Sequence, residues 1–196
     1  MGHVERKLRE KENVRNSILA AARKIATAEG WHAVTIRKIA DAIEYTAPIV
    51  YEHFENKSDV IRELVISGFK MLYDEVEKAQ ATESDPEKLL MQLSLIHWDF
   101  AFNNTDLFQL MFSLERPVPN EAALAAMHMI KDIFMKITKK SESEIEEIIF
   151  NWVCLLNGSV ATVMRFKDTP HSHMRTLNES RELYIGFINR FIKSIS

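Results

Sequence analysis

Three side chains in the N-terminal third of the chain could bind phosphate groups. Arg37 carries a guanidinium, Tyr51 a phenol hydroxyl and Lys57 an ammonium, all within the segment TIRKIADAIEYTAPIVYEHFENK of residues 35–57. Tyrosine and lysine side chains commonly contact the phosphate oxygens of DNA, and arginine can also bind guanine through two hydrogen bonds. The segment therefore predicts contacts with double-stranded DNA.

Two short helices are predicted to position these groups. Apolar residues recur at helical spacing over residues 36–43, and Thr35 can cap the N-terminus of that helix. A second helix is predicted from about residue 46 to residue 53, with Pro48 in its first turn. This pattern predicts a helix-turn-helix, in which the first turn of the second helix reaches base edges. The alternative is an ordinary helical corner whose tyrosine is buried and whose lysine is merely solvated.

The rest of the chain predicts further helices. With 5 Gly and 5 Pro among 196 residues, the sequence offers little of the turn chemistry that a many-stranded sheet needs. Helical periodicity predicts elements at about 10–29, 58–82, 86–103, 107–114, 121–139, 144–166 and 177–195. We expect an all-α fold with an N-terminal three-helix, helix-turn-helix DNA-binding domain at residues 1–57. A larger helical domain, for ligand binding and dimerisation, is expected at residues 58–196.

The charge distribution agrees only weakly with DNA binding. The formal net charge is −3, but residues 1–60 carry ten Lys/Arg against nine Asp/Glu, and residues 61–196 carry fifteen against nineteen. Local field rather than whole-chain charge governs attraction to phosphates. The slight excess of positive charge lies in the N-terminal part, which is the expected DNA-binding part. A basic arm there, interleaved with glutamates, contains Arg6, Lys7, Arg9 and Lys11.

Cysteine content and hydropathy predict a cytoplasmic protein. The single cysteine, Cys154, excludes an internal disulfide and fits a reducing compartment, and its apolar helix suggests an inert core thiol. No uninterrupted apolar run approaches the roughly 20 residues of a membrane span, and the charged N-terminus lacks the apolar stretch of a signal peptide. We therefore expect no membrane partner.

The motifs Thr35-Ile36-x-x-Ile39-Ala40 and Val50-Tyr51-x-His53-Phe54-x-x-Lys57 resemble those of the TetR family of bacterial repressors, with a dense match over residues 14–64. The resemblance implies a ligand-responsive transcriptional regulator that binds a near-palindromic operator as a homodimer. The DNA-facing positions that it implies are Thr35, Arg37, Thr46, Ala47, Pro48, Ile49, Tyr51, His53 and Lys57.

Four residues depart from the family pattern around the turn and the reading helix. Glu44 stands where the family usually has glycine, and Tyr45 where it usually has a small aliphatic residue. Ala47 replaces a frequent lysine, and Ile49 replaces a common threonine. Ile49 cannot hydrogen-bond a base, but it could pack on a thymine methyl group. These changes leave the fold intact and make the operator sequence unpredictable.

Two further surfaces are expected in the C-terminal part. Aromatic and methionine side chains with few polar groups suit a pocket for a small, mostly apolar ligand, although each residue taken singly fits plain core packing. The residues predicted for this pocket are His97, Trp98, Phe102, Phe108, Met111, Phe112, Met127, Phe134, Trp152 and Asn157. Small and aromatic residues on the last two helices predict a dimer interface at Gly158, Ala161, Phe187 and Phe191.

No catalytic constellation is visible in the sequence. There is no glycine-rich phosphate loop, nucleophile elbow or carboxylate pair, and His171 and His173 lack a nearby cysteine or acidic cluster that would complete a metal site. We expect neither an enzyme nor a cofactor. The competing hypothesis is a small-molecule binding or carrier protein that has lost DNA recognition, because Ala47, Ile49 and Glu52 are poor DNA contacts.

Overall fold

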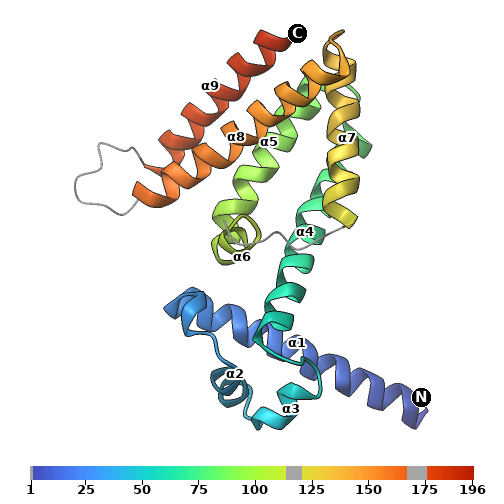
Figure 1. Cartoon of the computed structure of the whole chain (residues 1–196), viewed down its shortest axis with the longest axis vertical. Helices are drawn as coiled ribbons and strands as arrows, with labels where there is room; N and C mark the ends of the chain where they lie inside the picture. The colour runs from blue at the N-terminus through green and yellow to red at the C-terminus, as the bar shows by residue number, and fades with distance from the viewer. Residues whose placement is uncertain (1, 114–120, 167–175) are drawn as a thin grey trace. The chain divides into compact units, whose positions relative to one another are not determined.

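The computed structural model describes residues 2–113, 121–166 and 176–196, and these are helical almost throughout (Figure 1). The elements are α1 (His3–Glu29), η1 (Trp31–Ala33), α2 (Ile36–Ala42), α3 (Ala47–Tyr51), α4 (Lys57–Thr82), α5 (Pro86–Asn103), α6 (Thr105–Met111), α7 (Glu121–Ile137), α8 (Glu142–Phe166) and α9 (Leu177–Ile195), where η1 is a 3₁₀ helix. The all-α fold expected from the sequence is confirmed.

The first helix is longer than its apolar periodicity predicted. It begins at His3 instead of near residue 10. The backbone N–H of Gly2 donates to Oε2 of Glu5 at 3.0 Å, and Arg6 and Glu10 form an i,i+4 ion pair at 2.9 Å. Such local pairs support helix without burying any apolar side chain, so the apolar pattern does not detect these first turns.

The chain forms two compact units, and the division between them falls within α4. The first comprises Met1–Gly68 and Asn104–Pro119, and the second comprises Phe69–Asn103 and Asn120–Ser196. The first unit thus contains α6 as well as α1, η1, α2, α3 and the start of α4.

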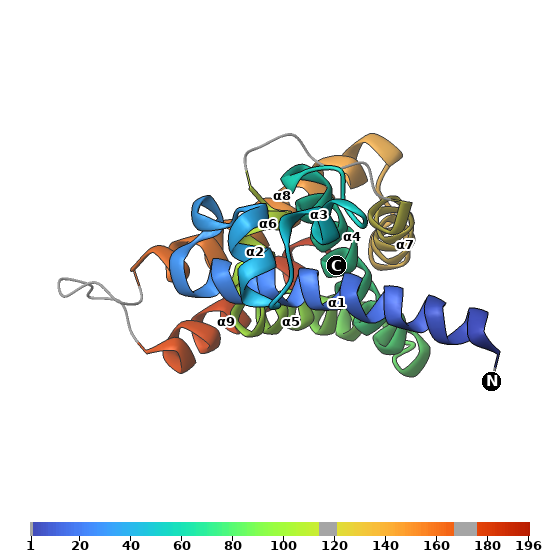
Figure 2. The ribbon, with the colours of Figure 1, turned by 90° about the horizontal axis from the view of Figure 1, so that it is seen from below.

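In the first unit, small residues on α1 allow α2 to pack closely against it. Ala21, Ala22 and Ala26 are buried on the α1 face, and Ile39 and Ala40 are buried on α2. In Figures 1 and 2, the first turns of α1 project past α2 and α3.

At two positions of the first unit, the local structure favours glycine over other residues. Gly30 ends α1 with φ 84° and ψ 160°, a backbone region that favours glycine, and its N–H donates to Ala26 O at 2.8 Å. Gly68 lies where α4 meets α6, and a Cβ there would come within 2.5 Å of the Met111 Sδ. A side chain at Gly68 would therefore force the Met111 side chain to move.

The second unit contains the end of α4 together with α5, α7, α8 and α9, and it has aromatic side chains in its core. Trp98, Phe134, Trp152 and Tyr184 are all buried. The rings of Trp98 and Tyr184 lie 4.7 Å apart, and those of Phe134 and Trp152 lie 5.9 Å apart in an edge-on arrangement.

Ser94 provides the hydrogen-bond partners for the polar atoms of this aromatic core. Its hydroxyl accepts from Trp152 Nε1 at 3.0 Å and donates to Leu90 O at 2.8 Å, while its carbonyl accepts from the Tyr184 hydroxyl at 2.7 Å. Burial raises the pKa of the Tyr184 hydroxyl, so it stays a neutral donor. One serine of α5 therefore links α8 and α9.

His97 makes the stability of the second unit depend on pH. Its side chain is buried, and this burial lowers its pKa to about 4. An unfolded histidine has a pKa of about 6.5, so between these values the unfolded chain binds a proton that the native chain does not. The contribution of His97 to the free energy of unfolding is therefore fully present above about pH 6.5. It is lost, by an amount on the order of 3 kcal/mol, as the pH decreases to about 4.

We predict that His97→Gln reduces this loss of stability on acidification. Urea unfolding of the two proteins at a series of pH values between neutral and about 4 measures it. His32→Gln is the matched control, because His32 is exposed and its replacement should leave the pH dependence unchanged. Equal pH dependence in wild type and His97→Gln would contradict the assignment.

Candidate nucleic-acid interface

The helix-turn-helix consists of α2, a four-residue turn and α3. The Thr35 hydroxyl accepts from the Lys38 N–H at 3.2 Å and caps α2, as predicted. The turn places Glu44 at φ 60°, in the left-handed region, and returns the Tyr45 N–H to Ala40 O at 3.0 Å. Pro48 lies in the first turn of α3, where its missing N–H costs no helical hydrogen bond.

Arg15 of α1 fixes the end of α3. Its guanidinium carbon lies 4.3 Å from the centre of the Phe54 ring, and Nη1 donates to His53 O at 3.1 Å. Its Nη2 lies 3.0 Å from Glu63 Oε2 on α4. Phe54 and Val50 are themselves buried. One α1 side chain thus contacts both the residues that follow α3 and the second turn of α4.

The remaining surface of α3 is open to solvent. Thr46, Pro48 and Tyr51 are exposed, and Ala47 and Ile49 are half-buried. Thr35 and Arg37 are also exposed, on the N-terminal side of α2. Tyr51 is 55% exposed, so the alternative of an ordinary corner with a buried tyrosine does not hold.

The side chain of His53 is partly covered, and its surroundings disfavour its charged form. Burial lowers its pKa, and the positive charges of Lys11 and Arg15 lower it further, with smaller opposing effects from Glu52 and Glu12. These effects favour the neutral imidazole, which offers one hydrogen-bond donor and one acceptor.

Lys57 has a structural contact that the sequence did not reveal. Its Nζ donates to Trp31 O at 2.9 Å. Trp31 Nε1 in turn donates to Asp106 O at 2.9 Å, at the start of α6. The Asp106 carboxylate accepts from Arg23 Nε at 2.7 Å and from Nη2 at 3.0 Å. These residues join α1, α4 and α6, and only tertiary structure brings them together.

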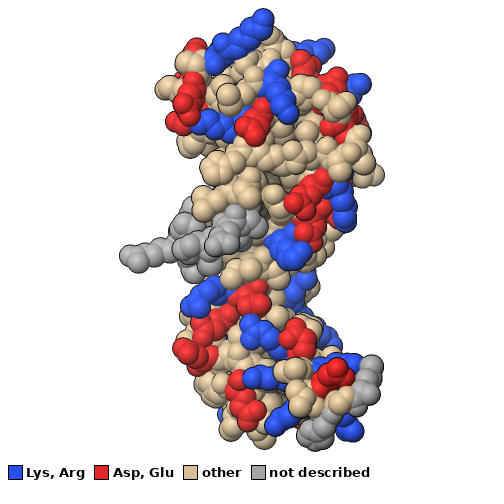
Figure 3. All heavy atoms as spheres, turned by 90° about the vertical axis from the view of Figure 1, so that its right-hand side faces the viewer, with Lys and Arg blue, Asp and Glu red and all other residues tan. Residues whose placement is uncertain are grey.

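Several basic side chains are paired with acidic ones. The Arg6–Glu10 pair is highly exposed, and Lys38 pairs with Glu29 at 2.6 Å. On the face that Figure 3 shows, basic and acidic side chains are interspersed and form no continuous basic area. On this face, any electrostatic attraction to DNA would therefore come from individual cations.

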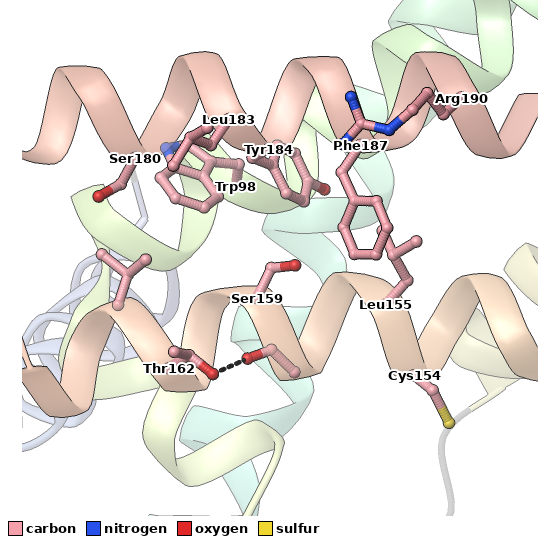
Figure 4. Close-up of a pocket in the computed structure, with 12 residues that line it drawn as sticks. Trp98, Cys154, Leu155, Ser159, Thr162, Ser180, Leu183, Tyr184, Phe187 and Arg190 are labelled. Carbon is pink, nitrogen blue, oxygen red and sulfur yellow. Dashed lines mark hydrogen bonds between the residues drawn. The ribbon is translucent and has the colours of Figure 1, made fainter. Parts of the chain in front are cut away.

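The second unit has an open groove of about 680 Å³ between α8 and α9. Its walls are Leu155, Ser159 and Thr162 on α8 and Leu183 and Phe187 on α9, with Trp98 of α5 at its base (Figure 4). Gly158 and Phe187, which were predicted at a dimer interface, both line it. Ala161 is exposed, whereas the Phe191 ring packs edge-on within the subunit, 6.5 Å from the centre of Phe134.

The residues predicted for a ligand pocket lie in both units. Phe108, Met111 and Phe112 are on or next to α6 in the first unit, and the other seven belong to the second. In the second unit, Phe134 and Trp152 are buried core residues, Met127 is exposed, and Trp98 borders the groove. Asn157 Nδ2 donates to Val153 O at 3.1 Å. The assignment of these ten residues to one pocket stays a prediction.

The expected burial of Cys154 is wrong. Its side chain is exposed and lies at the rim of the groove (Figure 4). Helix α8 is long and apolar enough to cross a membrane by length and composition alone. Within the described residues, 33% of its most apolar window is buried. Because this helix is apolar around much of its circumference, its sequence does not show which side faces the core.

No three His, Cys, Asp or Glu side chains gather as a metal site within the described ranges. His171 and His173 lie outside these ranges.

Comparison with known proteins identifies the N-terminal domain. Residues 18–64 match the family model described as bacterial regulatory proteins, tetR family.

Three solved structures share the fold. A TetR-family transcriptional regulator from Streptomyces coelicolor, SCO4454, has 18% identity, with 93% of this chain and 90% of that chain covered and a TM-score of 0.70. PfmR, a TetR-family transcriptional regulator from Thermus thermophilus, has 20% identity, with 90% and 97% covered and a TM-score of 0.62. FadR from Bacillus halodurans, a fatty acid degradation regulator, has 18% identity, with 92% and 93% covered and a TM-score of 0.66. At these identities the similarity shows the fold.

The strained turn gives a stability prediction. Because Glu44 has a positive φ, we expect Glu44→Gly to stabilise the protein by roughly 1 kcal/mol in urea unfolding. Asp41→Gly, near the end of α2, is the matched control and should destabilise by roughly 0.3 kcal/mol. A destabilising effect of Glu44→Gly would show that the turn carries no such strain.

Proposed function

We propose that this chain is a ligand-responsive transcriptional regulator of the TetR family, because residues 18–64 match that family's model and the chain shares the fold of its solved regulators. The observation that carries the proposal is the position of α3. Its apolar anchor, Val50, is buried, while Thr46, Pro48 and Tyr51 are left exposed on a helix-turn-helix. A transcriptional regulator acts on DNA in the cytoplasm.

A homodimer would present two copies of α3 to one operator. Adjacent half-sites on the same face of DNA have centres about 34–36 Å apart, so a two-fold symmetric protein prefers a near-palindromic sequence. The groove between α8 and α9 supports this proposal, because Leu183 and Phe187 are large apolar side chains left about half exposed at its wall. A second copy of the chain would cover them.

Ligand binding in the second unit would change DNA affinity. The possible change is bounded by the difference between the ligand's affinities for the DNA-binding and the released states. The ligand would be small and mostly apolar, in keeping with the aromatic and methionine residues of the second unit. We infer that binding of the protein at a promoter represses transcription.

The first experiment titrates the purified protein against DNA from upstream of its own gene, beside a scrambled duplex, at two salt concentrations. We expect specific binding that weakens as the salt concentration rises, with a slope set by the few cations that contact phosphate. If that DNA is not bound, selection from random sequences provides the second arm. Failure of both would favour a binding or carrier protein that has lost DNA recognition.

Arg37 provides a direct test of the DNA-facing surface. Arg37→Ala should weaken operator binding and reduce the slope of log affinity against log salt by about one, because one phosphate contact is lost. Lys88→Ala is the matched control, since Lys88 is an exposed cation on α5 in the second unit. An unchanged affinity and slope for Arg37→Ala would remove Arg37 from the interface.

Phe187 provides a test of the dimer surface. Phe187→Asp should convert the dimer to monomers in sedimentation measurements at micromolar concentration, because it would place a charge in the apolar contact. Leu124→Asp is the matched control, since Leu124 is an exposed leucine on α7 and is not among the groove's lining residues. A Phe187→Asp protein that remains dimeric would place the interface elsewhere.

A further inference from the structure

The recognition segment lacks the side chains that usually hydrogen-bond purines. Residues 39–55, IADAIEYTAPIVYEHFE, contain no Arg, Lys, Asn or Gln. Guanine is most often read by Arg or Lys, and adenine by Asn or Gln. The turn and the reading helix therefore cannot make the common bidentate contacts with either purine, and Arg37 on α2 remains as a separate cation.

Apart from the hydroxyls of Thr46, Tyr45 and Tyr51, the exposed surface of residues 45–51 is mostly carbon. Pro48 is exposed, Ala47 and Ile49 are half-buried, and the phenol rings of Tyr45 and Tyr51 are 48% and 55% exposed. The small side chain of Ala47 allows the α3 backbone to approach a groove closely. We call Tyr45, Ala47, Pro48, Ile49 and Tyr51 the apolar reading face.

Charge around this face also disfavours contacts with phosphate. Glu44 and Glu52 flank it and are exposed, and burial and the nearby cations lower the pKa of His53, which disfavours its charged form. The first turn of α3 therefore gains little from the DNA backbone, and its contribution must come from base edges.

The C5 methyl of thymine is the apolar group that a base pair presents in the major groove. We propose that the apolar reading face selects the operator by packing on thymine methyl groups, so that specificity follows the position of thymines and not hydrogen bonds to purines. This inference rests on the proposed DNA-binding function and names the feature of the DNA that this surface recognises.

The test removes those methyl groups. Selection from random duplexes with the full-length protein first yields an operator, and each thymine in it is then replaced by deoxyuridine, which pairs identically but lacks the methyl. We expect about fourfold weaker binding for each contacted methyl, and about fifteenfold when the same position is changed in both half-sites. The same substitution in scrambled DNA should have no effect.

Protein variants connect the methyl effect to α3. Pro48→Ala changes an exposed residue, and Ile49→Ala shortens a half-buried one. Each should bind the thymine operator more weakly and show a smaller penalty for uracil at one particular position. Arg37→Ala is the matched control: it weakens binding, but the ratio of thymine to uracil affinity should stay as in the wild type.

Two outcomes overturn the inference. If a specifically bound operator tolerates uracil at every thymine within twofold, methyl reading is wrong and the regulator function stands. If the uracil penalty is unaltered in both Pro48→Ala and Ile49→Ala, the methyl groups act through DNA shape and not through this face. Failure to select any operator would instead count against the proposed function itself.

Discussion

The position of α3 depends on the burial of Val50 and Phe54 beneath it. A helix of five residues is too short to be stable on its own, because forming a first helical turn costs more conformational entropy than its few hydrogen bonds return. Val50 is completely buried, and Phe54 is held under the Arg15 guanidinium. Arg15 also binds His53 O and Glu63, so α1 and α4 both hold the residues that end α3. Tertiary contacts thus supply the rigidity that the reading surface needs.

This dependence on tertiary contacts leaves the solvent-facing residues of α3 free to vary. In this chain those residues are mostly uncharged, and this has an electrostatic consequence. With one excess positive charge over residues 1–60 and an acidic segment at residues 39–55, long-range attraction to DNA is modest. Few phosphate contacts release few counterions, so the rest of the affinity for DNA would have to come from close contact with the bases. A surface of this kind gains from well-fitted apolar packing, which loses little in high salt.

The helix-turn-helix could be predicted from the sequence because its signals are local. The Thr35 cap, the Pro48 start and the apolar spacing of α2 each depend on neighbours within a few residues, and all three appear in the structure. The links from Trp31 to Lys57 and Asp106 could not be predicted, since they join residues 26 and 75 positions apart. The exposure of Cys154 was missed for another reason: α8 is apolar on its core side and also along the groove, so periodicity does not separate the two.

Lys57 shows why a matching motif does not fix a residue's role. As the first residue of α4 it places a positive charge at a helix N-terminus, where the helix dipole disfavours cations, and the Trp31 carbonyl offsets that cost. An ammonium has three donors, so two remain for a phosphate after the Trp31 contact. Removing Lys57 would therefore alter both the packing of Trp31 against α6 and any phosphate contact, and loss of DNA binding would not distinguish them. Arg37 is exposed, so the effect of its removal reports the DNA interface more directly.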